Sequence, residues 1–207
     1  MKISVVMASY LGNYPGCASN RIEKFKRSVN SFIDQTYEDK ELIIVSDGCE
    51  ISEQVYNEIY SKNINIIFKK IPKDVIFGGE PRNTGIEISS GEYICYLDTD
   101  DFFGKDHLQL IYNQLVDTGL DWVYYDDYLL NTFDSVYKYT CRVRENLLME
   151  TRIGTSSIVY KKLPNIKWGS GYGHDWYFIK KISETYSNYK KIYANYNVCH
   201  IPNIIDL

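Results

Sequence analysis

Four consecutive residues near the middle of the chain, Asp98-Thr99-Asp100-Asp101, hold its densest group of chemically capable side chains. Three carboxylates this close repel one another unless a cation neutralises them. Hard oxygen ligands suit Mg²⁺ or Mn²⁺, and such an ion can bridge to phosphate oxygens. The alternative is that Asp101 caps a following helix while Asp98 and Asp100 stay solvated. The tetrapeptide therefore predicts either a divalent-cation site or the start of a helix.

Small and polar residues also follow two other apolar runs that have the character of strands. Residues 8–10 (Ala-Ser-Tyr) follow the first run and residues 46–48 (Ser-Asp-Gly) follow the second. In open α/β sheets ligands bind beyond the carboxyl ends of the strands, so these segments are expected at the same site as the acidic tetrapeptide. Asp175, in a Gly-His-Asp sequence, opens a further predicted helix, where the helix dipole stabilises a carboxylate even without a catalytic role.

Two common nucleotide-binding motifs are missing from the sequence. A dinucleotide fingerprint needs Gly-x-Gly-x-x-Gly directly after the first strand, but residues 8–12 read Ala-Ser-Tyr-Leu-Gly. The glycine-rich run at residues 169–173 follows no predicted strand. No Gly-x-x-x-x-Gly-Lys-Ser/Thr occurs either, which excludes P-loop chemistry.

The positions of apolar residues predict the elements that must hold these side chains. Four β-branched runs without alternation indicate strands covered on both faces, at 2–8, 41–46, 64–69 and 92–97. Helical spacing predicts a helix with apolar positions from Ile22 to Ile33 and Asn20 as its cap, and others at about 51–61, 81–89 and 105–117. This alternation predicts a three-layer α/β/α sandwich with a mixed, mostly parallel central sheet.

The pattern changes after residue 120. Residues 121–126 and 135–142 are aromatic and partly alternating, which predicts an antiparallel addition to the sheet. Residues 155–160 predict a further short strand, and residues 174–184 a final helix. No repeat or linker interrupts the chain, so a single domain is expected.

Composition narrows the class of protein. The 207 residues are 44% hydrophobic and 24% charged, which is typical of a globular protein and excludes a disordered chain. A net charge of −4 offers no general attraction to nucleic acid or anionic lipid, and no apolar run is long enough for a transmembrane helix. Five cysteines without a CxxC pair disfavour a zinc site and a disulfide framework, and predict a cytoplasmic location.

Four motifs follow one another along the chain: SVVMASY, then Gln35-Thr36-Tyr37 before ELIIVSDG, then PRNTGIEISSGEYICYLDTDD, then GHDWYF. Together they resemble the nucleotide-sugar-dependent glycosyltransferases of the GT-A fold, family 2 type, over about residues 2–185. The resemblance implies an inverting, metal-dependent transfer of a sugar from a UDP-sugar to a hydroxyl group of a glycan or other acceptor. UDP-glucose is the expected donor because it is so widely used.

The same resemblance divides the expected domain into two parts. Residues 1–120 would bind the nucleotide-sugar, and residues 121–207 would supply the acceptor site and the base. The chain is expected to be either a complete small enzyme or the N-terminal domain of a longer polypeptide.

The resemblance implies a set of donor-binding residues: Ala8, Ser9, Tyr10, Asp47, Arg82, Asn83, Asp98 and Thr99. Asp47 would accept a hydrogen bond from the uracil imide, although Ser46 and Cys49 replace the neighbouring Asp and Ser of the commoner Asp-Asp-Gly-Ser pattern. Arg82 would reach base or phosphate, and tying its helix to the sheet is the alternative.

The resemblance also implies a metal site and a base. Asp100, with Asp98, would bind Mn²⁺ or Mg²⁺, and His200 matches a metal-binding histidine near the C-terminus, although a lone histidine is often a packed or surface residue. Asp175 matches the catalytic base that takes the proton of the acceptor hydroxyl. His174 stands where the family usually has an acidic residue, so the charge beside the base differs.

Aromatic residues are expected on the acceptor side, where Tyr124, Tyr125, Tyr172 and Trp176 could stack on sugar rings. Packing in the core is the alternative for each of them. His107 is predicted to be structural.

Two other functions remain open at this point. A sugar nucleotidyltransferase would also use acidic metal ligands, but it needs a basic, glycine-rich loop after the first strand, and residues 8–12 lack basic side chains. A non-catalytic nucleotide-sugar or glycan-binding domain would not need Asp175, which is present.

Overall fold

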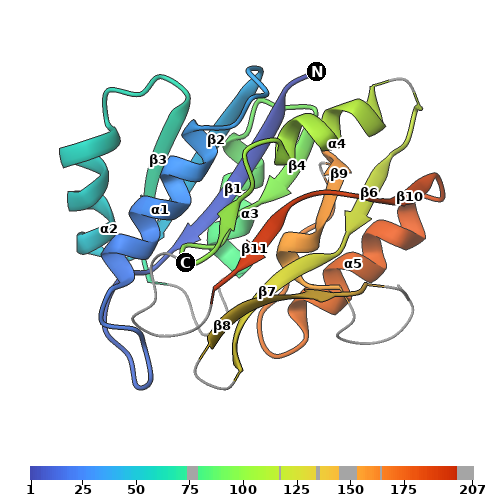
Figure 1. The fold of residues 1–207 in the computed structure, drawn as a ribbon. Coiled ribbons are helices and arrows are strands. Elements are labelled where there is room, and N and C mark those ends of the chain that lie inside the picture. The colour runs from blue at the N-terminus through green and yellow to red at the C-terminus, as the bar shows by residue number, and fades with distance from the viewer. Residues whose placement is uncertain (74–78, 117, 134–135, 145–152, 164, 200–207) are drawn as a thin grey trace.

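The structure is a computed structural model that describes residues 1–73, 79–116, 118–133, 136–144, 153–163 and 165–199. A seven-stranded sheet runs through its centre (Figure 1). Its strands, in chain order, are β1 (Ile3–Ser9), β2 (Lys40–Asp47), β3 (Ile66–Ile71), β4 (Tyr93–Tyr96), β6 (Trp122–Tyr125), β9 (Ile158–Lys161) and β10 (Tyr189–Ile192).

The strands lie in the spatial order β10-β6-β9-β4-β1-β2-β3. The β4-β1-β2-β3 part is entirely parallel, whereas β9 is antiparallel to both of its neighbours, β4 and β6, and β10 is parallel to β6. A mixed, mostly parallel sheet is therefore confirmed.

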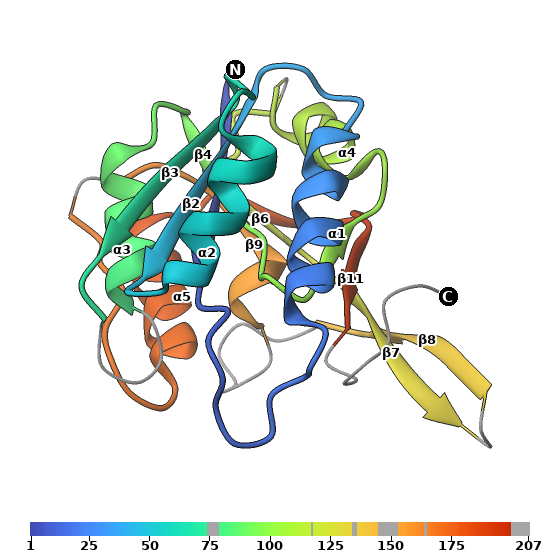
Figure 2. The same ribbon diagram turned by 90° about the vertical axis from the view of Figure 1, so that its left-hand side faces the viewer.

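Helices cover both faces of the sheet (Figure 2). On one side lie α1 (Arg21–Ile33), α2 (Glu50–Val55) with a π-helical turn at Tyr56–Tyr60, and α4 (His107–Leu115). On the other lie α3 (Gly79–Ile88) and α5 (His174–Thr185). Successive β1 residues supply both cores, because Val5 packs with the α1 side and Val6 with the α3 side. Asn20 precedes α1 as expected, but its side chain makes no capping hydrogen bond.

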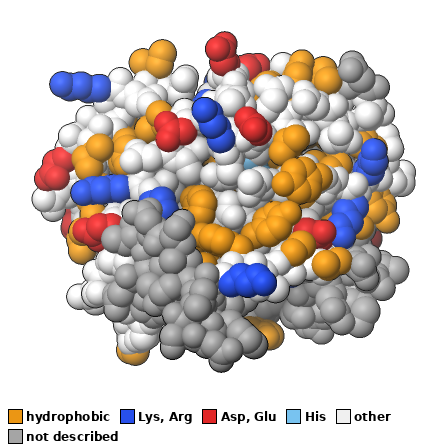
Figure 3. All heavy atoms as spheres, viewed as in Figure 1, with side chains coloured by type: hydrophobic (Ala, Val, Ile, Leu, Met, Phe, Trp, Pro, Cys, Tyr) orange, Lys and Arg blue, Asp and Glu red, His pale blue; other side chains and the backbone are white. Residues whose placement is uncertain are grey.

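A second, four-stranded sheet lies in front of the first in Figure 1. It contains β5 (Phe102–Phe103), β7 (Asp127–Phe133), β8 (Val136–Arg142) and β11 (Tyr196–Val198), in the order β5-β11-β7-β8. The prediction that residues 135–142 extend the central sheet was therefore wrong, because β8 pairs with β7 and β9 takes the antiparallel place beside β4. Hydrophobic side chains gather over β11 and β7 on the face shown in Figure 3.

Buried charge joins the small sheet to the rest of the molecule. The Asp127 carboxylate is 1% exposed and pairs with Arg142 at 2.5 Å and with Arg144 at 2.6 Å. It also accepts a hydrogen bond from the Ser157 hydroxyl at 3.0 Å. These partners hold the start of β7 against the turn that leads into β9.

Among the described residues, no helix is long and apolar enough to cross a membrane. All five cysteines are free thiols. The cytoplasmic location stays a prediction.

Glu41, at the start of β2, is a buried acid that connects three segments. Its carboxylate accepts hydrogen bonds from the Ser4 hydroxyl at 2.5 Å, from the Ser90 backbone N–H at 2.6 Å and from the Ser90 hydroxyl at 2.7 Å, and it pairs with Lys2 at 3.0 Å. Burial acts to raise its pKa, but the hydrogen bonds from Ser4, Ser90 and Lys2 together outweigh burial and lower the pKa to about 2.

We expect the substitution Glu41→Gln to show that the Glu41 carboxylate contributes to the free energy of unfolding in a pH-dependent way. The folded-state pKa lies below the unfolded value, so Glu41 stabilises the fold above about pH 4.5 and loses that effect as the pH falls towards 2. The gap in unfolding free energy between wild type and Glu41→Gln should narrow by about 3 kcal/mol across this window in urea titrations. A gap independent of pH would contradict this, and exposed Glu87→Gln is the control.

Candidate active site

The parallel strands bring the predicted polar segments together at one edge of the central sheet. Ala8 on β1 is in register with Val45 on β2, and Val6 is in register with Tyr96 on β4. Residues 8–10 begin at the first of these pairs, and residues 46–48 and 98–101 begin just beyond them, so the three segments start close together. This is the site expected from the strand ends.

The acidic loop is held in place mainly through its backbone. The Asp101 N–H donates to the Asp98 carbonyl at 3.2 Å, and the Ser28 hydroxyl of α1 donates to the same carbonyl at 2.9 Å. The Arg27 guanidinium donates to the Asp100 carbonyl, and it lies 4.6 Å from the centre of the Phe102 ring. Side chains of helix α1 thus bind the backbone carbonyls of the loop, while the side chains of Asp98 and Asp100 line the adjacent pocket.

Asp101 has a different role from its two neighbours. It is 1% exposed and accepts a hydrogen bond from the Tyr196 hydroxyl at 2.9 Å and another from the Cys199 N–H at 2.9 Å. The Tyr196 oxygen in turn accepts from the Asp98 N–H at 3.2 Å. Burial, with the nearby charges of Asp101 and Asp98, raises the pKa of Tyr196 well above its ordinary value, so the phenol stays protonated. Asp101 therefore secures β11 instead of capping α4, which begins at His107.

A pocket of about 550 Å³ opens beside the acidic loop. Its lining combines acidic side chains, Asp98 and Asp100, with basic ones, Arg21, Lys24 and Arg82. The other lining residues are Ala8, Tyr14, Gly16, Cys17, Ala18 and Thr99. A mixture of carboxylates and cations at strand ends suits an anionic ligand that also carries a metal.

Arg21 and Lys24 were missed by the sequence analysis, although their spacing of three on one helix places both on the same face. The Arg21 guanidinium donates to the Tyr10 and Gly12 carbonyls and lies 4.7 Å from the Tyr14 ring centre. Lys24 is 1% exposed and donates to the Cys199 carbonyl at 3.0 Å. The two cations thus attach the loop after β1 and the end of β11 to helix α1.

Arg82 and Asn83 connect the acidic loop to the segment that leads into α5. Arg82 pairs with Asp98 at 3.3 Å, and its guanidinium carbon lies 5.2 Å from the Trp168 ring centre. The Asn83 amide forms two hydrogen bonds with the Trp168 backbone, accepting from its N–H at 2.7 Å and donating to its carbonyl at 3.1 Å. The Asn83 side chain thus connects α3 to the segment before α5, not to a strand of the sheet.

Trp168 is fixed from several sides, which positions the start of α5. Its indole N–H donates to the Tyr96 hydroxyl at 2.9 Å, and its ring stacks on Phe178 of α5 at 3.9 Å. A Cβ on Gly79, at the start of α3, would lie 2.2 Å from the Gly169 carbonyl oxygen, so only glycine permits this approach.

Asp175 lies in the first turn of α5 and is partly exposed. The helix starts after Gly173, whose φ of 79° lies in the left-handed region that glycine adopts without strain. The Asp175 carboxylate accepts a hydrogen bond from the Trp176 N–H at 2.9 Å. His174 Nδ1–H donates to the Gly171 carbonyl at 2.9 Å, and its ring lies 5.6 Å from Trp168. The residue directly before Asp175 is thus in contact with the Trp168 ring.

Asp47 lies at the end of β2 and is paired with a residue that the sequence analysis did not select. The Lys73 ammonium donates to the buried Asp47 carboxylate and lies 4.6 Å from the Tyr10 ring centre. The Ser9 hydroxyl, by contrast, shares a buried hydrogen bond of 2.9 Å with Ser52. Tyr10 and Asp47 therefore flank a common position, whereas the Ser9 side chain faces the interior.

Two of the aromatic residues expected near an acceptor are core residues. Tyr125 is fully buried and donates to the Ser156 carbonyl at 2.7 Å, and Tyr124 is 8% exposed within β6. That expectation was wrong for both, because β6 lies inside the central sheet between β9 and β10.

His107 is structural as predicted: it stacks on Phe103 at 4.2 Å, and burial lowers its pKa to about 3.

The donor set at the pocket fits a divalent cation only in part. Within the described part of the chain, no three His, Cys, Asp or Glu side chains come together as a complete metal site. Asp98 and Asp100 do offer hard oxygen atoms towards the pocket, which suit Mg²⁺ or Mn²⁺ when phosphate oxygens complete the coordination. The predicted ligand His200 lies outside the described residues.

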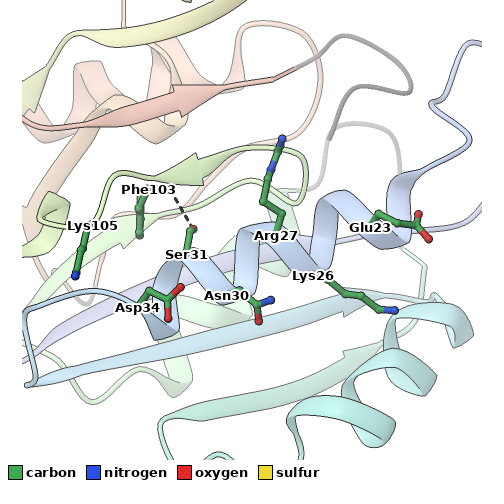
Figure 4. A pocket seen from close by; sticks show the side chains of 8 residues that line it. All are labelled: Glu23, Lys26, Arg27, Asn30, Ser31, Asp34, Phe103 and Lys105. Atoms are coloured by element: carbon green, nitrogen blue, oxygen red, sulfur yellow. Dashed lines mark hydrogen bonds between the residues drawn. The ribbon is translucent and has the colours of Figure 1, made fainter. Parts of the chain in front are cut away.

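A larger depression of about 880 Å³ lies along the outer face of α1 (Figure 4). Its lining is mostly charged and includes Lys26, Asp34 and Lys105. Its lining contains Phe103 of β5 but no residue from the strand ends of the central sheet, so the chemistry is expected at the smaller pocket.

Comparison with known proteins agrees with this geometry. A sequence profile of the family described as Glycosyl transferase family 2 matches residues 17–186. The poly(ribitol-phosphate) beta-N-acetylglucosaminyltransferase TarP of Staphylococcus aureus is 32% identical over 114 residues, which cover 54% of this chain and 32% of TarP. The uncharacterized glycosyltransferase MJ1057 of Methanocaldococcus jannaschii is 30% identical over 179 residues, covering 78% of this chain and 58% of that protein. The chain thus spans only part of these relatives.

Solved structures show the same fold at low sequence identity. The structure of S. aureus TarS 1–349 in complex with UDP-GlcNAc superposes with a TM-score of 0.78 at 17% identity, over 99% of this chain and 60% of that one. The mannosyltransferase PcManGT from Pyrobaculum calidifontis, in complex with GDP-Man and Mn²⁺, gives 0.68 at 11% identity, over 98% and 57%.

We expect Asp101→Ala to destabilise the protein strongly, because it leaves the Tyr196 hydroxyl and the Cys199 N–H without their buried acceptor. The free energy of unfolding should fall by about 3 kcal/mol in urea titrations. Asp106→Ala, five residues further along, is the matched control, because it removes one exposed hydrogen bond, from the Thr36 hydroxyl at 3.1 Å, and should lower stability much less than Asp101→Ala does. Equal stability of the two variants would show that the Asp101 contacts do not hold β11.

Proposed function

The chain belongs to glycosyltransferase family 2, and we propose that it transfers a sugar from a UDP-sugar to a hydroxyl group of an acceptor. The observation that carries this proposal is the pocket at the strand ends, where Asp98 and Asp100 meet three basic side chains. Such a site suits a diphosphate with a divalent cation. Family membership favours this function over a sugar nucleotidyltransferase.

The proposed donor site extends along the edge of the sheet. Tyr10 and Asp47 are proposed to bind the uracil, Asp98 and Thr99 the ribose, and Arg82 the diphosphate. Support comes from the TarS structures, which are described as complexes with UDP and with UDP-GlcNAc. For the sugar, UDP-glucose remains the first donor to test and UDP-GlcNAc the second, because relatives are named for transfer of each sugar.

A divalent cation is proposed to complete the donor site. Asp100 and Asp98 would hold Mn²⁺ or Mg²⁺, with His200 as a further proposed ligand. When bound, the ion offsets the diphosphate charge and stabilises UDP as the leaving group. The structure of PcManGT, described as a complex with Mn²⁺, supports this choice.

Asp175 is the proposed catalytic base. An acceptor hydroxyl gives its proton to this carboxylate as its oxygen attacks the anomeric carbon on the face opposite UDP, which inverts the configuration. The ring of Trp168 contacts both Arg82 and His174, so one side chain connects the donor pocket to the residue before the base. This connection supports a single domain, with a donor part at residues 1–120 and an acceptor part at 121–207.

The acceptor is proposed to be a glycan or another hydroxyl compound that approaches over the start of α5. Tyr172 is 84% exposed and Tyr177 is 58% exposed, and both lie within three residues of Asp175. The rings of Trp176 and Tyr177 lie 4.8 Å apart. Exposed aromatic faces beside a base are well suited to stack on a sugar ring.

We expect UDP to bind with Mn²⁺ and far more weakly with a chelator, since Asp98 and Asp100 repel a bare diphosphate. Isothermal titration calorimetry of the full chain measures both affinities. Asp100→Ala should bind UDP weakly under both conditions. Equal affinity of wild type with and without metal would contradict the metal-dependent donor site.

Asp175→Asn should separate binding from chemistry. The variant should bind UDP as the wild type does but transfer sugar at least about 10²-fold more slowly, because a positioned base is lost. The assay measures UDP release from UDP-glucose and UDP-GlcNAc with a panel of glycan acceptors. Asp126→Asn is the control, because Asp126 is engaged by Lys191 at 2.9 Å and by the Arg144 N–H at 2.7 Å. An unchanged rate for Asp175→Asn would exclude it as the base, and a binding-only domain would show no release in any variant.

A further inference from the structure

The ion pair between Asp47 and Lys73 lies at the proposed binding site of the uracil ring. Lys73 donates to Asp47 Oδ2, and its ammonium lies 4.6 Å from the centre of the Tyr10 ring. The Asp47 carboxylate is 8% exposed, whereas the Lys73 side chain is 51% exposed. The pair thus presents a buried acceptor and an accessible donor side by side, next to an aromatic face.

The backbone fixes this arrangement. Gly48 follows Asp47 with a φ of +63°, and a Cβ there would lie 2.7 Å from the Lys73 backbone nitrogen. The Gly48 N–H also donates to the Ile71 carbonyl at 3.0 Å. Lys73 is therefore anchored directly against the turn that carries Asp47, unlike a lysine on a free surface loop.

An acceptor beside a donor matches one type of base edge. Uracil presents its N3–H donor next to the O4 acceptor, so a carboxylate and an ammonium can bind both atoms at once. Cytosine presents the reverse, an N3 lone pair next to an amino group, and would place acceptor against acceptor and donor against donor. Guanine shares the N–H and C=O pattern of uracil at N1 and O6, whereas adenine resembles cytosine.

We propose that Lys73 is a specificity-determining residue, which donates to O4 of uracil while Asp47 accepts from N3–H. A carboxylate offers about four lone-pair positions, so Asp47 can keep its bond to Lys73 while it binds the base. This inference rests on the proposed UDP-sugar donor. It adds a physical reason for preferring uridine over cytidine nucleotides.

UDP and CDP are the matched probes, because they differ only at positions 3 and 4 of the base. Calorimetry with Mn²⁺ should show that wild type prefers UDP and that Lys73→Met lowers the UDP/CDP affinity ratio about tenfold. That is the effect of one charge-assisted hydrogen bond at a half-exposed site. Lys73→Arg should restore part of the ratio. Lys70→Met is the control. It removes the same charge, but from a lysine that pairs with Glu50 and Glu53 on α2.

The ratio separates this role from the other effects of a lysine. If Lys73→Met weakens UDP and CDP equally, Lys73 supplies only charge, and the inference is overturned. If Lys73→Met binds UDP more tightly, Lys73 competes with the base for Asp47, which overturns it as well. Melting temperatures without nucleotide establish that each variant is folded. If wild type binds UDP and Lys73→Met has the same UDP/CDP affinity ratio as wild type, only this inference is refuted. If wild type binds neither nucleotide, the proposed donor site is refuted as well.

Discussion

The buried carboxylate of Asp101 is the contact on which the arrangement of the site depends. A buried charge is costly unless hydrogen bonds satisfy it, and here a tyrosine hydroxyl and a backbone N–H do so. Both donors come from β11 or the residue directly after it, nearly a hundred residues further along the chain. The acidic loop and β11 therefore stabilise each other. Lys24 reinforces the connection by binding the Cys199 carbonyl from α1.

The three neighbouring carboxylates of the acidic loop have different roles. Asp101 points into the protein, while Asp98 and Asp100 remain partly exposed at the pocket. Arg27 and Ser28 hold the loop by its carbonyls and leave those carboxylates to the pocket. A loop with three acidic side chains can thus keep its shape while offering two of them to a ligand.

A second connection joins the pocket at the strand ends to Asp175, the proposed catalytic base. Trp168 contacts Arg82 and the Asn83 amide on α3, the Tyr96 hydroxyl on β4, and Phe178 on α5. A chain of contacts thus runs from Asp98 through Arg82 and Trp168 to the helix that carries Asp175. Close packing of this kind keeps two parts of a site in register over a long sequence separation.

Local patterns in the chain predicted the parallel core, the helices around it and the meeting of three polar segments at one edge. Helix and strand periodicity are short-range patterns, and strands that are apolar on both faces and alternate with helices are typical of a parallel sheet. The small sheet escaped prediction, since β5 and β11 are two and three residues long and exist only through pairing with distant partners. The burial of Asp101, the ring contacts of Trp168 and the Asp47–Lys73 pair were likewise decided by tertiary structure. A carboxylate, an indole or a lysine has the same chemistry in any sequence, and only packing sets whether it faces a pocket, the core or an opposite charge.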